Sequence, residues 1–115
     1  VLGTECWGVT YTAAHVCALK DTLSDLSCTY KHPAGLRVVK SVWFIKEQAD
    51  GEPVDVREDV EYQGRVQYTQ SSQNNSSLRI TNLTERDAQT YRIRFYTDDP
   101  KGRYTGQPGV SLSVT

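Results

Sequence analysis

The sequence predicts an all-β domain, an antiparallel sandwich of two sheets, and three observations support this fold class. Short segments of alternating apolar and polar residues recur along the chain, for example at residues 26–30 and 110–114, and a period of two is typical of strands with one buried face. Turn-forming pairs such as Asp50-Gly51 separate the segments. No longer segment has a convincing helical period. About eight short strands with regular turns favour a sandwich.

The chain has 115 residues, which is enough for one hydrophobic core but not for two. We therefore expect one domain over residues 1–115. Thirteen basic and 14 acidic residues give a net charge of −1, so nucleic acid and anionic membranes are not expected as partners. The sequence contains neither an apolar run long enough to span a membrane nor a segment like a signal peptide.

The first half of the chain predicts three strands. Residues 6–12 are rich in aromatic and β-branched side chains, which favours an edge strand with Trp7 in the core. Alternation over residues 26–30 directs three side chains inward: Leu26, Cys28 and Tyr30. Residues 38–46 form the most apolar segment.

Period two sets the orientation of the side chains in the segment 38–46. Trp43 follows Cys28 by 15 residues, which is the place of the core tryptophan in an immunoglobulin sandwich. If Trp43 points inward, Val42 and Phe44 point outward. The same parity in residues 90–96 puts Arg94 on an outward face, so we expect these residues to share one face.

The second half predicts strands around residues 53–56, 64–68, 78–80, 91–96 and 110–114. Arg65 and Asp87 are expected to form a bidentate bridge that fixes two loops at one end of the sandwich. Gly106 and Gly109 precede the last strand as expected bulge positions. The predicted core takes one residue from each of five alternating segments: Leu26, Trp43, Ile80, Ile93 and Leu112.

Cysteines and glycosylation motifs both predict an oxidising, extracellular location. The chain has three cysteines, Cys6, Cys17 and Cys28, and an odd number leaves at least one without a partner inside the chain. Acceptor motifs for N-glycosylation begin at Asn74, Asn75 and Asn82. We therefore expect a secreted or surface glycoprotein.

Several segments together resemble the amino-terminal variable-type domain of the Siglecs, the sialic-acid-binding immunoglobulin-like lectins. The resemblance spans nearly the whole chain. It is carried by Trp7-Gly-Val, Cys28-Thr-Tyr-Lys-His-Pro33, Val42-Trp43-Phe44, Gly64-Arg65, Leu78-Arg-Ile80 with Leu83, and Tyr91-Arg-Ile-Arg94-Phe95. It implies an immunoglobulin V-set sandwich in the ectodomain of a type I membrane receptor.

The resemblance also implies a binding site for sialylated glycans. The family's essential sixth-strand arginine matches Arg94, its first-strand aromatic residue matches Trp7, and Tyr104 stands where the family has a tryptophan. Arg103 and Thr105, beside Tyr104, complete the candidate site. An arginine suits this ligand, because a guanidinium binds a carboxylate at two points and a lysine cannot.

The chain departs from the family at its disulfide. The second core cysteine of an ordinary immunoglobulin domain is replaced by Ile93, and the fifth-strand cysteine of the family falls at Ser76. Cys28 is therefore expected to be a buried free thiol unless Cys6 or Cys17 comes within about 7 Å between Cα atoms. The resemblance suggests Cys17 for a bridge to a neighbouring domain.

A second class of function uses the same face for pairing with other immunoglobulin-type domains. Outward-facing Val42, Phe44 and Tyr96 would supply an apolar contact area. An enzyme is not expected, since His15 and His32 are far apart and no nucleophile motif or acidic pair is recognisable. The wide spacing of the cysteines gives no metal site, and no cofactor or catalytic residue is expected.

Overall fold

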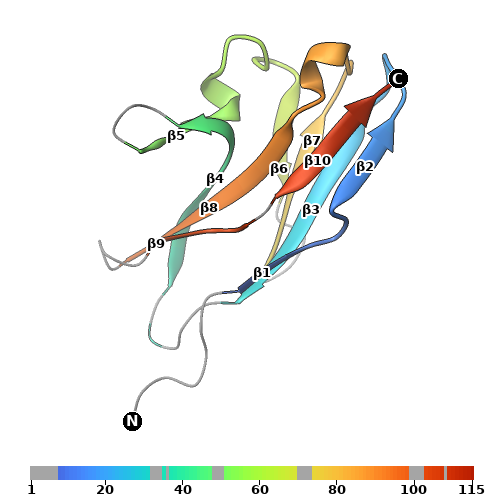
Figure 1. Cartoon of the computed structure of the whole chain (residues 1–115). Coiled ribbons are helices and arrows are strands. Elements are labelled where there is room, and N and C mark those ends of the chain that lie inside the picture. The colour runs from blue at the N-terminus through green and yellow to red at the C-terminus, as the bar shows by residue number, and fades with distance from the viewer. Residues whose placement is uncertain are drawn as a thin grey trace.

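The structure, a computed structural model, describes residues 8–31, 35, 37–47, 51–69, 74–98, 103–107 and 109–115. In this part of the chain two sheets pack face to face, as the sequence predicts (Figure 1). One sheet has the order β1-β3-β7-β6. Its strands are β1 (Gly8–Tyr11), β3 (Ser24–Lys31), β7 (Asn75–Ile80) and β6 (Val66–Thr69).

The second sheet has the order β2-β10-β8-β4-β5, with β9 paired to β8. Its strands are β2 (His15–Ala18), β10 (Val110–Val114), β8 (Thr90–Thr97), β4 (Val38–Glu47), β5 (Pro53–Asp55) and β9 (Arg103–Thr105). Two 3-10 turns, η1 (Val56–Glu58) and η2 (Glu85–Asp87), complete the elements. No helix among the described residues is long and apolar enough to cross a membrane.

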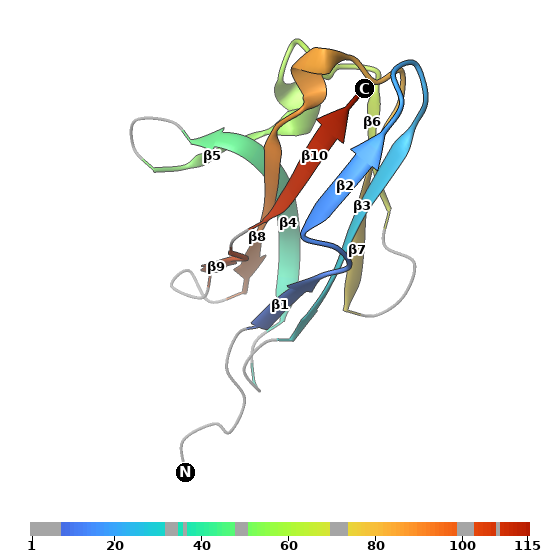
Figure 2. The ribbon, with the colours of Figure 1, turned by 45° about the vertical axis from the view of Figure 1, so that its right-hand side comes forward.

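The sequence did not predict β2. This strand follows β1 after a short turn, yet it joins the other sheet, where it pairs in parallel with β10 (Figure 2). The remaining strand pairs are antiparallel. Strand β2 escapes a local analysis because its partner β10 lies almost the whole chain away.

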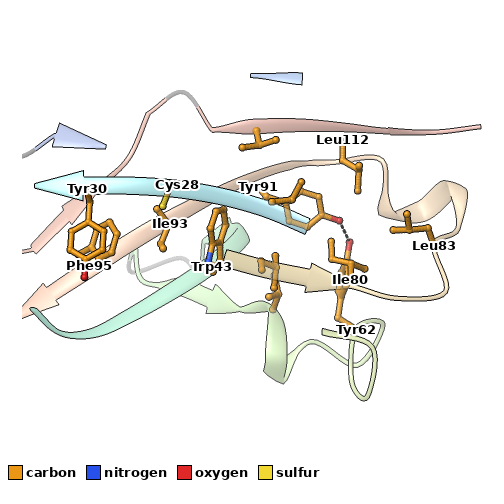
Figure 3. Packing of buried hydrophobic residues seen from close by; sticks show 14 residues of the cluster. Cys28, Tyr30, Trp43, Tyr62, Ile80, Leu83, Tyr91, Ile93, Phe95 and Leu112 are labelled. Carbon is orange, nitrogen blue, oxygen red and sulfur yellow. Dashed lines mark hydrogen bonds between the residues drawn. The ribbon is translucent and has the colours of Figure 1, made fainter. Parts of the chain in front are cut away.

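The core lies between the sheets and contains all five predicted residues, Leu26, Trp43, Ile80, Ile93 and Leu112. Figure 3 labels four of them, Trp43, Ile80, Ile93 and Leu112, together with aromatic residues of the same core. Burying aromatic and branched side chains between the sheets is the main stabilising contribution in a sandwich of this kind.

Tyr91 fixes the start of β8. Its hydroxyl donates a hydrogen bond of 2.7 Å to the carbonyl of Asp87 and lies 3.0 Å from the hydroxyl of Tyr62 (Figure 3). A tyrosine that bonds to the backbone just upstream of its strand is the tyrosine corner of immunoglobulin-type domains. It joins η2 to β8 and so sets where β8 begins.

Val42 and Phe44 correct the sequence analysis. Both were expected to be exposed on the face of Arg94, but only 3% and 1% of their surface is accessible. The guanidinium of Arg94 lies 5.7 Å from the centre of the Phe44 ring. Long cationic side chains commonly lie along neighbouring apolar surface. The sequence pattern does not show that Arg94 covers Phe44 in this way.

The cysteines agree with the prediction as far as the structure describes them. Cys28 is a buried free thiol, paired in register with Ser76, and burial raises the pKa of the thiol to about 12. Cys17 is free and exposed on β2. Cys6 lies outside the described residues. Gly106 and Gly109 lie between β9 and β10 rather than within one bulged strand.

Candidate functional site

Arg94 lies in the middle of a rigid sheet. It belongs to β8, and its register partners are Val42 of β4 and Thr105 of β9. Its side chain projects away from the core but is only 15% exposed. The covering residues come from strands on both sides, so Arg94 is held from two directions.

The guanidinium of Arg94 lies among polar groups from three segments of the chain. Nε donates to Oγ1 of Thr105 at 2.8 Å, and Nη1 donates to the carbonyl of Gly51 at 3.3 Å. Nη2 lies 3.4 Å from a carboxylate oxygen of Glu47, and Nη1 lies 3.8 Å from one of Glu52. Arg94 therefore makes one short hydrogen bond and two longer ion pairs, which together hold its position.

Glu52 connects Arg94 to two further residues. Its Oε1 accepts a hydrogen bond of 3.1 Å from Nη1 of Arg103, and its Oε2 accepts one of 3.2 Å from the hydroxyl of Tyr96. Burial is the main cause that raises the pKa of Tyr96, and the nearby Glu52 carboxylate acts in the same direction. Tyr96 thus stays a neutral donor at physiological pH.

Most of the predicted site residues meet at one surface depression. A concavity of about 360 Å³ is lined by Gly51, Glu52, Arg94, Arg103, Tyr104 and Thr105. Four of these residues, Arg94, Arg103, Tyr104 and Thr105, form part of the candidate site from the sequence. The fifth residue of that site, Trp7, lies outside the described residues.

Tyr104 lines the concavity from the middle of β9. It is the register partner of Phe95, whose side chain is in the core, and directly paired residues of antiparallel strands project to the same face. Burial first of all raises the pKa of Tyr11 to about 12, and the neighbouring Tyr104 adds to this rise. Tyr104 therefore projects to the same side of the sheet as Phe95, and its residue borders the concavity.

Sequence reasoning missed Glu47, Gly51 and Glu52. Two of the three residues bring negative charge to the guanidinium, so the site is of mixed charge and not simply cationic. A signal was available, because the hairpin pair Asp50-Gly51 returns the chain along the strand that contains Trp43. It places Glu52 beside the sheet but does not specify which side chain reaches Arg94.

A second concavity, of about 540 Å³, is lined by residues of η2 and of the neighbouring turns. Four of its six charged residues form ion pairs with one another. Arg65 binds Asp87 with two hydrogen bonds of 2.8 and 2.9 Å, as the sequence predicted, and Lys20 pairs with Glu85 at 3.1 Å. Arg65 and Asp87 are therefore committed to a structural contact at this concavity.

The described residues contain no group of three or more His, Cys, Asp or Glu side chains that could hold a metal ion. His15 is exposed on β2, and His32 lies outside the described part. The arrangement at Arg94 offers hydrogen-bond donors and acceptors to a ligand.

Comparison with known proteins supports the fold. No family model and no curated protein matches the sequence. Among solved structures, murine CRIg is similar, with 18% sequence identity, a TM-score of 0.73, and coverage of 96% of this chain and 99% of that chain. A similarity at this identity is one of architecture. Together with the two sheets and the tyrosine corner, it shows that the chain has the immunoglobulin V-set sandwich fold.

Proposed function

We propose that this domain is a non-enzymatic recognition module that binds an extracellular protein partner on the Arg94 face. This face is the outward side of β4, β8 and β9 together with the adjoining turn, and it includes Lys40, Glu47, Glu52, Arg94, Tyr96, Arg103 and Thr105. The observation that carries the proposal is the concavity at Arg94, because it gathers charged side chains from separate strands on a rigid sheet.

The charges of the Arg94 face support a protein partner. Two arginines and two glutamates alternate over a small area, and such a pattern selects a partner with the complementary arrangement. Strands hold Glu47, Arg94 and Arg103 in place, which reduces the entropy lost on binding. The glycosylation motifs and the fold support an extracellular location on a type I membrane receptor.

A sialylated glycan is the second candidate ligand. It is favoured by the joint presence of Arg94, Arg103 and Thr105 at one concavity and by the Siglec resemblance. The cation needed for the sugar carboxylate is present, but Glu47 and Glu52 already interact with it. A glycan would therefore compete with two internal carboxylates for the guanidinium.

Binding of a fluorescent multimer of the domain to cells tests both candidates. A protein partner predicts that neuraminidase treatment of the cells leaves binding unchanged, whereas a sialylated glycan predicts its loss. In either case Arg94→Ala should abolish binding. Arg79→Ala, an exposed position on β7 of the other sheet, is the matched control and should bind normally.

A second variant separates a broad protein interface from a small glycan site. Lys40 is exposed on the Arg94 face, with its ammonium 5.4 Å from the centre of the Tyr96 ring, but does not line the concavity. Lys40→Glu should weaken binding of a protein partner and leave a monosaccharide contact nearly unchanged. Phe44→Ala cannot serve here, because Phe44 is buried. Equal binding by Arg94→Ala and the parent domain would contradict both candidates.

A further inference from the structure

The carboxylate of Glu52 lies in a nest of three donors, Arg94, Tyr96 and Arg103. One oxygen accepts from Arg103 at 3.1 Å, and the other accepts from Tyr96 at 3.2 Å and lies 3.8 Å from Arg94. A hydroxyl and two guanidinium groups around one point are the groups that bind a carboxylate in proteins. The domain therefore contains a formed carboxylate position, and one of its own side chains fills it.

Glu52 fills this position loosely. Strong charge-assisted hydrogen bonds from nitrogen to a carboxylate are about 2.7–2.9 Å long, and the distances from Glu52 to both arginines are longer. The Glu52 side chain is 44% exposed, so water screens its ion pairs. A ligand carboxylate that makes shorter contacts with the arginines can therefore displace Glu52.

The backbone that carries Glu52 is also weakly attached. Glu52 lies between Gly51, which has a φ of +85°, and β5, a strand of three residues. Strand β5 pairs with β4 at two positions, with a register shift between them. Arg94 and Tyr96, in contrast, belong to β8, which pairs along its length with β4 and on its other side with β9 and β10. Glu52 can therefore leave the nest without disrupting the central strands.

We propose that Glu52 is an internal competitor, whose carboxylate occupies the place of a ligand carboxylate and sets the affinity of the Arg94 site. The inference rests on the proposed function and adds a specificity-determining residue to it. A ligand that offers only a carboxylate replaces the contacts of Glu52 with equivalent ones, so its net gain in binding free energy is small. Binding therefore requires a ligand that places a carboxylate in the nest and makes further contacts around it.

Replacing Glu52 tests the competition directly. The probes are N-acetylneuraminic acid, as a sugar carboxylate, and N-acetyl-aspartic acid amide, as a protein-type carboxylate. Titration is followed through the arginine side-chain Nε–Hε signals in nuclear magnetic resonance spectra. For at least one probe, E52Q should lower the dissociation constant roughly 3–10-fold, since one competing charge-assisted contact is lost. The probe whose dissociation constant falls in E52Q shows which source of carboxylate the nest accepts.

Three further variants control the experiment. E85Q makes the same charge change on η2, away from the nest, and should leave both dissociation constants unchanged. E52A removes the side chain and should reproduce the gain of E52Q, and Arg94→Ala combined with E52Q should abolish it. Equal affinities of E52Q, E85Q and the parent domain, or no binding of either probe by any of them, would overturn the inference.

The outcomes separate this inference from the proposed function. Cell binding that depends on Arg94 but is not strengthened by E52Q leaves the recognition module standing and removes Glu52 as a competitor. A gain of probe affinity in E52Q without any cell binding supports the competition at the nest and contradicts the proposed function.

Discussion

Two arginine–carboxylate contacts at different places in the sandwich use the same chemistry in different ways. Arg65 meets Asp87 at 2.8 and 2.9 Å and also donates to the carbonyls of Glu61, Thr81 and Asn82. Asp87 is 1% exposed and accepts a further hydrogen bond from the backbone of Thr84. Arg94 meets its two glutamates at 3.4 and 3.8 Å. We call the first pair closed, because its carboxylate is buried and fully hydrogen-bonded. We call the second pair open, because its carboxylates are exposed and lie farther from the guanidinium.

The difference lies in the carboxylates and in what carries them. Asp87 is buried next to the tyrosine corner, where every oxygen has a donor, and a buried ion pair is stable only under that condition. Glu47 and Glu52 are nearly half exposed and lie near a short edge strand. Arg94 is no more exposed than Arg65, at 15% against 20% of its side-chain surface. A closed pair fixes the fold, whereas an open pair has exposed carboxylates that a ligand can displace.

The largest effect is expected at the closed pair. Asp87→Ala leaves the Arg65 guanidinium and the Thr84 amide without their buried acceptor, and losing one partner of such a pair costs about 3–5 kcal/mol. Urea denaturation followed by tryptophan fluorescence measures this loss. A change below about 1 kcal/mol would mean that Asp87 is not a central support of the fold.

Arg94→Ala should have an intermediate effect on stability. The replacement removes the hydrogen bond to Thr105 and uncovers Phe44, for an expected loss of about 1–2 kcal/mol. An outward strand residue would ordinarily be expected to contribute little to stability, and Arg94 is predicted to contribute more than that. The same denaturation measures it, and circular dichroism should still show a β-sheet spectrum. A loss as large as that of Asp87→Ala would remove the distinction between the two pairs.

Gly51→Ala tests the open pair through the backbone of the turn that carries Glu52. A Cβ at Gly51 meets no atom, but a φ of +85° is unfavourable for alanine and costs about 1 kcal/mol. The strain acts on the turn that presents Glu52, so the Arg94 Nε–Hε signal should shift as well. Gly64→Ala, which has a φ of +78° and equally open surroundings, is the matched control and should leave that signal unchanged.

The smallest effect is expected at a third pair, Asp25 with Arg79, which is exposed on the other sheet. The hydrogen bond from Arg79 is the main cause that lowers the pKa of Asp25. A lowered pKa in the folded state contributes stability above the unfolded value and loses it as the pH falls through the folded value. Because solvent screens this pair, Asp25→Ala should leave the denaturation midpoint unchanged within error at pH 7. A clear loss would show that exposure does not distinguish the three pairs.

The core could be predicted from the sequence because its signal is local. Alternation places Leu26, Trp43, Ile80, Ile93 and Leu112 on the inward side without knowledge of any strand's partner. The contact between Arg65 and Asp87 was also predictable, since both residues flank turns at the same end of a sandwich. Ser76 opposite Cys28 followed from the family pattern, and the register confirms it.

The candidate site was predictable only in part. Strand parity predicted the outward position of Arg94, and the resemblance supplied Arg103 and Thr105, which line the same concavity. The burial of Phe44 and the approach of Glu47 and Glu52 were not predicted. Each of these depends on which strands are neighbours and on the course of a turn, and neither is contained in a pattern of period two.

The sequence by itself thus determined the sandwich, its core and the outward position of Arg94, because each follows from the alternation of side chains along single strands. Only the tertiary structure decided what surrounds Arg94. Its guanidinium is long enough to reach residues that lie 11 to 47 positions away in the chain. Contacts of that separation depend on strand order and turn geometry. Strand order and turn geometry therefore decide whether an arginine forms a closed ion pair, as with Asp87, or an open one, as with Glu52.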